Sequence, residues 1–181
     1  MNAHWRILSA ALALISAMSL AQAHSASDAY LTLSAAQEPS KSATLQGQWD
    51  VALRDLDFAM KLDDDGDGNI TWAELRRHQP EIVRYAMPRL RFEAGGKACT
   101  VKPTKQLVDN HADGAYAALF FDVDCAGAVK GAALTRVAMD YSLFFKIDPS
   151  HRAILVMRSG AETSTAVLSP ENAKIELKLA P

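Results

Sequence analysis

The feature that most constrains this 181-residue chain is a twelve-residue segment, residues 63–74. Aspartate occupies its first, third and fifth positions, glycine the sixth, isoleucine the eighth and glutamate the twelfth. Acidic runs are most often solvated surface loops. A solvated loop gives no reason for glycine at the sixth position or glutamate at the twelfth, so the spacing predicts a folded loop whose oxygen atoms converge on one point.

Oxygen donors at positions 1, 3, 5, 7, 9 and 12 of such a loop are the calcium ligands of an EF-hand. The expected ligands are the carboxylates of Asp63, Asp65, Asp67 and Glu74, the backbone carbonyl of Asn69, and the Thr71 hydroxyl or a water bound to it. Gly68 would supply the sharp turn, and Ile70 would anchor the loop to a core. We therefore expect Ca²⁺ as the cofactor. EF-hands usually occur in pairs, and no second segment has this pattern, which favours a structural or permanently filled site over cooperative sensing.

Residues on both sides of the loop have helical spacing. Before it, Leu53, Leu56 and Met60 form the apolar face of an expected amphipathic helix. After it, Trp72 and Leu75 begin a second helix that Pro80 should end or restart. We expect this helical insert to span about residues 48–87. Five arginines follow the loop and either balance its charge or form a docking surface for an acidic partner or anionic membrane: Arg76, Arg77, Arg84, Arg89 and Arg91.

Elsewhere the pattern changes to period two. Apolar and polar residues alternate over 137–147 and over 174–179, which predicts two half-buried strands. Shorter strands are expected near residues 29–33, 90–92, 117–123 and 154–157, separated by glycine- and proline-containing turns. The expected fold is α+β: an immunoglobulin-like antiparallel β-sandwich, with the helical EF-hand segment inserted after the first strand.

Residues 1–23 have the organisation of a secretory signal peptide. His4 and Arg6 precede an apolar run over residues 7–20, and Ala21-Gln22-Ala23 forms a cleavage site. The apolar run is too short to span a bilayer. We therefore expect a single exported domain of residues 24–181, located in the periplasm or secreted.

The two cysteines agree with export. Cys99 and Cys125 are the only cysteines in the chain, and we expect them to form a disulfide. The alternatives are two buried thiols or a metal site. Neither cysteine belongs to a CxxC unit or has a histidine at ligand spacing, which disfavours the metal site.

Charge and motifs exclude several functions. The formal net charge of −2 gives no basic excess for nucleic acid. The chain has no GxSxG, HExxH or phosphate-binding glycine loop, so we expect no enzyme. His111, with Asp109 and Asp113, forms either an acid/base group or simply a polar turn.

A histidine at the expected mature terminus raises a copper hypothesis. Cleavage after Ala23 would expose His24, whose imidazole and α-amine could chelate copper together. His78, His111 or His151 would be the third donor. The alternative is that His24 is simply the first residue of a flexible terminus.

Three segments outside the loop itself carry a family resemblance: residues 49–57, 106–116 and 140–149. With the loop, they resemble the extracytoplasmic amino-terminal region of HupE/UreJ-type bacterial membrane proteins. Relatives in that family continue into a multi-span membrane region associated with metal transport. This sequence ends at Pro181, so the resemblance implies an accessory or partner role and not transport.

Two functions follow as expectations. The first is an exported calcium-binding domain in which one EF-hand stabilises or switches a non-enzymatic surface for a membrane or periplasmic protein. The alternative is a periplasmic accessory protein for nickel or copper handling beside a membrane transporter. An unrecognised hydrolase is a third, weaker class.

Overall fold

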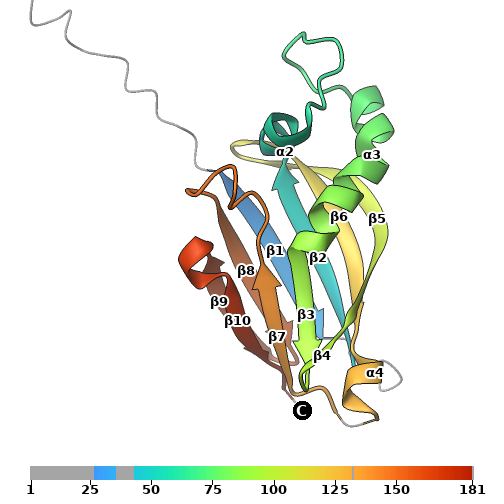
Figure 1. The fold of residues 1–181 in the computed structure, drawn as a ribbon, viewed down its shortest axis with the longest axis vertical. Coiled ribbons are helices and arrows are strands. Elements are labelled where there is room, and N and C mark those ends of the chain that lie inside the picture. Colours follow the sequence, from blue (N-terminus) through green and yellow to red (C-terminus); the bar gives the residue numbers. More distant parts are fainter. Residues whose placement is uncertain (1–26, 36–42, 132, 181) are drawn as a thin grey trace, which may run out of the picture.

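The computed structural model describes residues 27–35, 43–131 and 133–180 as two β-sheets packed against each other, with a helical segment at one end (Figure 1). The expected signal peptide and His24 lie outside the described residues. None of the helices in the described ranges is long and apolar enough to cross a membrane.

The larger sheet has six strands in the order β5-β6-β2-β1-β8-β9. Their bounds are β1 Asp28–Ala35, β2 Thr44–Ala52, β5 Thr100–His111, β6 Gly114–Asp124, β8 Arg152–Ser159 and β9 Glu162–Leu168. All neighbours are antiparallel except β1 and β8, which are parallel. The smaller sheet has the order β10-β7-β3-β4, with β3 Leu90–Ala94, β4 Lys97–Ala98, β7 Arg136–Tyr141 and β10 Lys174–Lys178.

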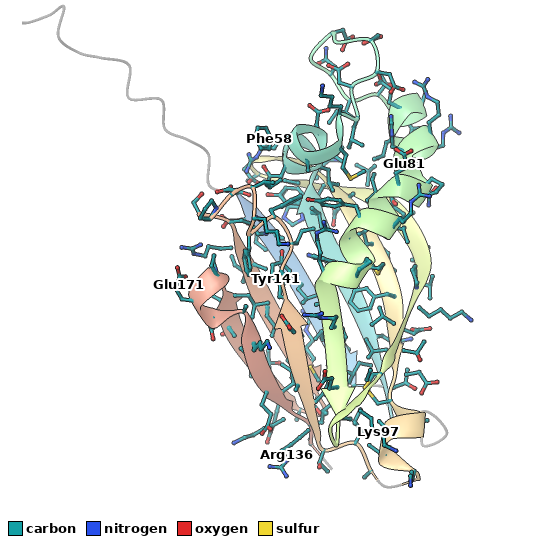
Figure 2. All side chains as sticks on the ribbon, in the orientation of Figure 1. Phe58, Glu81, Lys97, Arg136, Tyr141 and Glu171 are labelled. Atoms are coloured by element: carbon teal, nitrogen blue, oxygen red, sulfur yellow. A yellow bond between two sulfur atoms is a disulfide. The ribbon has the colours of Figure 1, made fainter. Side chains whose placement is uncertain are left out.

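Apolar side chains from both sheets meet in one core. Trp49 of β2 and Tyr141 of β7 are fully buried, with ring centroids 5.5 Å apart in an edge-to-face arrangement. Figure 2 shows Tyr141 on the strand that faces the larger sheet. Phe92 of β3 and Phe121 of β6 form a second pair at 6.3 Å. Such pairs add to the free energy of apolar burial, and here they hold the two layers together.

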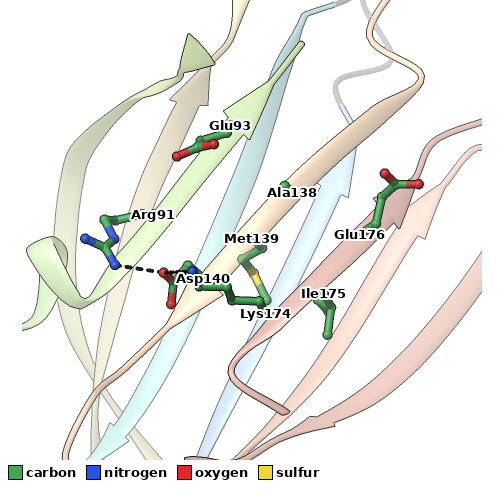
Figure 3. Close-up of a pocket in the computed structure, with 8 residues that line it drawn as sticks. All are labelled: Arg91, Glu93, Ala138, Met139, Asp140, Lys174, Ile175 and Glu176. Atoms are coloured by element: carbon green, nitrogen blue, oxygen red, sulfur yellow. Dashed lines mark hydrogen bonds and ion pairs between the residues drawn. The ribbon is translucent and has the colours of Figure 1, made fainter. Parts of the chain in front are cut away.

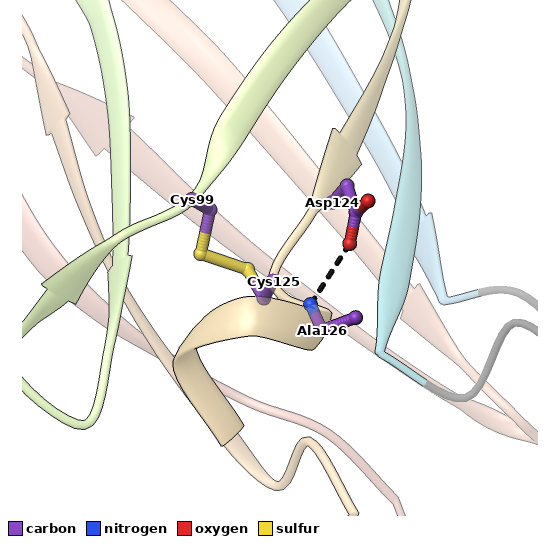
Figure 4. Close-up of a disulfide and its surroundings, with 4 residues drawn as sticks. All are labelled: Cys99, Asp124, Cys125 and Ala126. Carbon is purple, nitrogen blue, oxygen red and sulfur yellow. Dashed lines mark hydrogen bonds between the residues drawn. A yellow bond between two sulfur atoms is a disulfide. The ribbon is translucent and has the colours of Figure 1, made fainter. Parts of the chain in front are cut away.

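The predicted disulfide is present. Cys99, just before β5, is bonded to Cys125, just after β6, with a Cα–Cα distance of 4.5 Å (Figure 4). Cys125 begins the short helix α4, Ala126–Val129, whose first N–H donates to the Asp124 carboxylate at 2.8 Å. The bond therefore fixes the end of the molecule opposite the acidic loop of residues 63–74.

The helical segment is shorter at its start than predicted. It consists of α2 Leu53–Met60, α3 Trp72–Ala86 and the 3₁₀ turn η2 Met87–Arg89. Residues 48–52 instead belong to β2, the second strand, so the segment follows β2 and not the first strand. Because β2 pairs with β1 on one side and β6 on the other, its backbone is satisfied as a strand. The prediction that Pro80 ends or restarts the helix is wrong, because α3 runs through it.

The strand predicted over residues 137–147 is also shorter. It ends at Tyr141, although Leu143 and Phe144 are both buried, because the backbone leaves the extended conformation at Phe144. Phe144 has φ of +58°, and its carbonyl accepts the N–H groups of Ile147 and Asp148. A compact turn therefore follows β7. The turn after β9 is a second 3₁₀ element, η3 Pro170–Asn172.

Candidate metal centre

The acidic loop joins α2 to α3 at one end of the molecule (Figure 1). Helix α2 ends at Lys61, whose φ of 57° turns the chain out of the helix. Asp57 then holds the loop entrance, because its Oδ1 accepts the N–H groups of Leu62 at 2.7 Å and Asp63 at 3.0 Å. Leu62 is fully buried, so the first residue of the loop lies beside an anchored core residue.

Glu74 holds the loop exit. Thr71 is the N-cap of α3: its Oγ1 accepts the N–H of Glu74, and Glu74 Oε2 accepts the N–H and O–H of Thr71 at 2.8 and 2.7 Å. Glu74 Oε1 also accepts the N–H of Asp64 at 2.9 Å. The Thr71 hydroxyl and these N–H groups lower the pKa of Glu74 to about 2. The carboxylate is therefore ionised at neutral pH and ties the two ends of the loop together.

Three of the predicted calcium ligands lie close together. Asp63, Asp65 and Asp67 each place one carboxylate oxygen within 4.8 Å of the others. Both oxygens of Asp63 accept backbone N–H groups, from Gly66 and Gly68 at 2.8 Å each. Both glycines have positive φ. Hard carboxylate oxygens gathered at this spacing fit the ligand preference of Ca²⁺.

The other three predicted ligands have different roles in this conformation. Glu74 and Thr71 form the hydrogen-bonded cap of α3, and the Glu74 carboxylate is not a member of the aspartate group. Asn69 is exposed, and its N–H donates to Asp67 Oδ1 at 2.7 Å. Ile70 is partly buried and packs against the core, as predicted. The structure therefore gathers three of the four predicted carboxylate ligands.

Asp64, at the second loop position, connects the loop to α3. It pairs with Arg77 and with His78 Nε2, each at 2.9 Å. His78 Nδ1 pairs with Glu81 at 2.8 Å, and Glu81 and then Asp64 raise the pKa of His78. These ion pairs are consistent with the interpretation of the basic stretch as a counterweight to the acidic loop.

Three of the other arginines also have contacts within the protein. Arg76 lies over the Trp72 ring at 5.9 Å, and Arg89 lies over the Tyr85 ring at 3.8 Å. Arg91 pairs with Asp140 at 2.7 Å in a groove of about 440 Å³ along β3, β7 and β10 (Figure 3). These three arginines therefore have aromatic or carboxylate contacts within the protein, and the docking surface for an acidic partner or anionic membrane stays a prediction.

The three residues of the predicted acid/base group or polar turn, Asp109, His111 and Asp113, do not all lie together. His111 and Asp109 lie in one group with Asp50 of β2, whereas Asp113 accepts the Tyr116 hydroxyl at 2.8 Å. Asp50 was missed from the sequence, because residues 48–52 were predicted to belong to the helical segment. Alternation through Gln46, Gln48 and Asp50 is the signal that could have identified it.

His151 is not available as a copper ligand. Its side chain is fully buried, and Nδ1 lies 2.7 Å from Ser27 Oγ while Nε2 lies 2.8 Å from Tyr141 Oη. Both ring nitrogens are thus occupied within the protein. Of the three proposed third donors, His111 and His78 remain partly accessible.

Comparison with known proteins adds no assignment. Neither the protein-family models nor the curated protein sequences contain a match to this chain. The resemblance to HupE/UreJ-type proteins therefore stays a prediction, and the functional argument rests on the sites themselves.

Proposed function

We propose that the protein is an exported calcium-binding domain in which a single EF-hand, inserted in an immunoglobulin-like β-sandwich, holds a non-enzymatic binding surface. The observation that carries the proposal is the convergence of Asp63, Asp65 and Asp67 within 4.8 Å, in a loop fixed at both ends. The disulfide supports export, because such bonds persist in oxidising compartments.

Calcium would add positive charge where three carboxylates repel one another. The loop joins two helices whose apolar residues belong to the core, including Leu56 of α2 and Leu75 and Ile82 of α3. Fixing the loop would therefore fix the angle between these helices. In an exported protein, a site with a Kd of about 10⁻⁴ M would stay mostly filled. At about ten times Kd, binding adds about 1.4 kcal/mol to the free energy of unfolding.

The proposed binding surface lies beside the loop. Phe58 of α2 is 76% exposed and Trp72 of α3 is 53% exposed, although both are large apolar side chains. Figure 2 shows Phe58 at the outer side of α2. Exposed aromatic residues are enriched at protein interfaces and at membrane surfaces. These two residues are the proposed contact for a membrane or periplasmic protein. Because the loop joins α2 to α3, bound calcium would fix the distance between Phe58 and Trp72.

Isothermal titration with calcium tests the proposal. Asp65→Asn and Asp67→Asn remove ligand charge at exposed positions, and Asp64→Asn is the matched control because Asp64 lies in the same loop outside the aspartate group. We expect one calcium per wild-type chain, binding at least about tenfold weaker in the first two variants, and little change in the control. Equal affinity in all four proteins would refute the assignment.

Transition-metal handling beside a membrane transporter is the second candidate function. Its support is the family resemblance together with a mixed carboxylate and imidazole group of Asp50, Asp109 and His111. Imidazole favours transition metals over calcium. A neighbouring coding region for a multi-span membrane protein would favour this candidate.

A further inference from the structure

Strand register brings three metal-ligating residues to the outer face of the larger sheet. Asp50 of β2 and Leu107 of β5 both pair with Ala118 of β6, so their side chains point to the same face. Asp109 and His111 follow Leu107 at intervals of two and share that face. Asp109 and His111 are far from Asp50 in the sequence. The pairing of both β2 and β5 with β6 brings the three residues together.

The separation of the ligand atoms suits a tetrahedral metal ion. Each of the three residues offers one ligand atom within 4.8 Å of the others, and His111 Nε2 lies 3.4 Å from Asp50 Oδ2. A charge-assisted hydrogen bond is shorter, at about 2.7–2.9 Å. Two tetrahedral ligands that each lie about 2.0–2.1 Å from zinc are about 3.3 Å apart. The Asp50–His111 distance is therefore close to the separation of two ligands of one ion.

Neighbouring side chains hold the ligands in place. Gln48 Nε2 donates to Asp50 Oδ1 at 2.8 Å, which orients the carboxylate with its other oxygen toward His111. The His111 ring lies against two tyrosine rings, with centroid distances of 4.7 Å to Tyr30 and 4.2 Å to Tyr116. Outer contacts of this kind fix ring orientation and carboxylate geometry at metal sites.

The charge balance also favours a cation. The side chain of Asp50 is only 10% exposed, so its carboxylate is largely removed from water. Asp109 adds a second carboxylate beside that of Asp50, and a bound cation would offset both. Because Asp109 is exposed and His111 is partly exposed, an ion can reach the group from solvent.

We propose that Asp50, Asp109 and His111 bind one divalent transition-metal ion of the zinc class, with solvent or a ligand at the fourth position. One imidazole and two carboxylates are a donor set that zinc accepts, and three protein ligands leave one position open. The site is separate from the acidic loop, so it stands or falls independently of the calcium proposal.

Zinc titration with a competing chromophoric chelator tests the site, with excess calcium present to occupy the acidic loop. We expect one saturable zinc per wild-type chain. His111→Gln and Asp109→Asn should bind zinc at least about 100-fold more weakly, and Gln48→Leu about tenfold more weakly. His78→Gln is the matched control, because His78 also contacts two carboxylates, and its zinc affinity should equal that of the wild type.

Two results would overturn the proposal. One is a wild-type protein without saturable zinc binding, and the other is a His111→Gln variant whose near-ultraviolet circular dichroism and zinc affinity both match the wild type. If the His111→Gln variant does not fold, nuclear magnetic resonance on the wild type tests the site directly. The resonances of the His111 ring should then shift when one equivalent of zinc is added. Resonances of His78 that shift instead would place the ion elsewhere and refute the assignment.

Discussion

Acidification should destabilise this protein through His151, which is neutral and fully buried. Ser27 Oγ donates to Asp55 at 2.9 Å, so it accepts a hydrogen bond from His151 Nδ1–H. The other ring nitrogen, Nε2, is then the acceptor for the Tyr141 hydroxyl at 2.8 Å. Protonation of Nε2 would remove that acceptor and place a charge among aromatic rings.

The pKa shift sets the size of the effect. Burial lowers the pKa of His151 from 6.5 to about 4, although the charge of Asp148 opposes the shift. Between these values the unfolded chain binds a proton that the folded protein does not, so the free energy of unfolding falls as pH falls. The contribution is present above about pH 6.5. It should fall by about 2 kcal/mol between about pH 7 and pH 5, and by about 3 kcal/mol in total.

Urea unfolding followed by the fluorescence of the buried Trp49 measures this loss. His151→Gln is the comparison, because glutamine can donate to Ser27 and accept from Tyr141 but does not titrate. The wild type should lose about 2 kcal/mol more than the variant between about pH 7 and pH 5. Parallel pH profiles for the two proteins would refute the assignment of this loss to His151.

Two further predictions concern packing and the disulfide. Gly47→Ala would place a methyl group 2.2 Å from the buried Phe121 ring and should lower the free energy of unfolding in urea by about 1–3 kcal/mol. Gly127→Ala is the control and should be nearly neutral, because nothing lies within 4 Å of the added methyl group. Equal losses in the two variants would contradict the packing. Replacing Cys99 and Cys125 together by alanine opens a link across 26 residues and should cost about 3–4 kcal/mol by the same assay, and an unchanged unfolding midpoint would contradict this estimate.

Alternation predicted the strands that have one face in the core. Residues near β1, β3, β7 and β10 were identified because one side of each packs inward while the other is more exposed. Strands β6 and β8 were identified as short, mostly apolar runs. The method failed at β2, where four successive residues from Trp49 to Ala52 are buried. Such a central strand has no alternation near its end, and its apolar spacing resembled a helix.

The edge strands β5 and β9 were not predicted, because they have too few buried residues to show an apolar pattern. Most residues of β5 are exposed or only partly buried, and its register shifts between Pro103 and Lys105, so no apolar period is present. Strand β9 is also mostly exposed. Their hydrogen bonds to β6 and β8 define them, and such pairing cannot be derived from local sequence.

The two candidate metal sites also differ in how far local sequence can predict them. Every predicted ligand of the acidic loop lies within twelve consecutive residues, so spacing alone was enough to propose the set. The bends at Gly66 and Gly68 follow from the freedom of glycine to take positive φ. The Asp50–Asp109–His111 group is assembled by strand pairing across β6. Sequence reasoning identified Asp109 and His111 but did not place Asp50 beside them, because that proximity depends on the strand pairing.

The measurement that tests the calcium proposal most directly is the melting midpoint in calcium, in equimolar magnesium and in chelator. At about ten times Kd, calcium should raise the wild-type midpoint by about 3–6 °C, magnesium should have a smaller effect, and an Asp65→Asn, Asp67→Asn double variant should not respond. The same wild-type midpoint in calcium and in chelator would contradict the account.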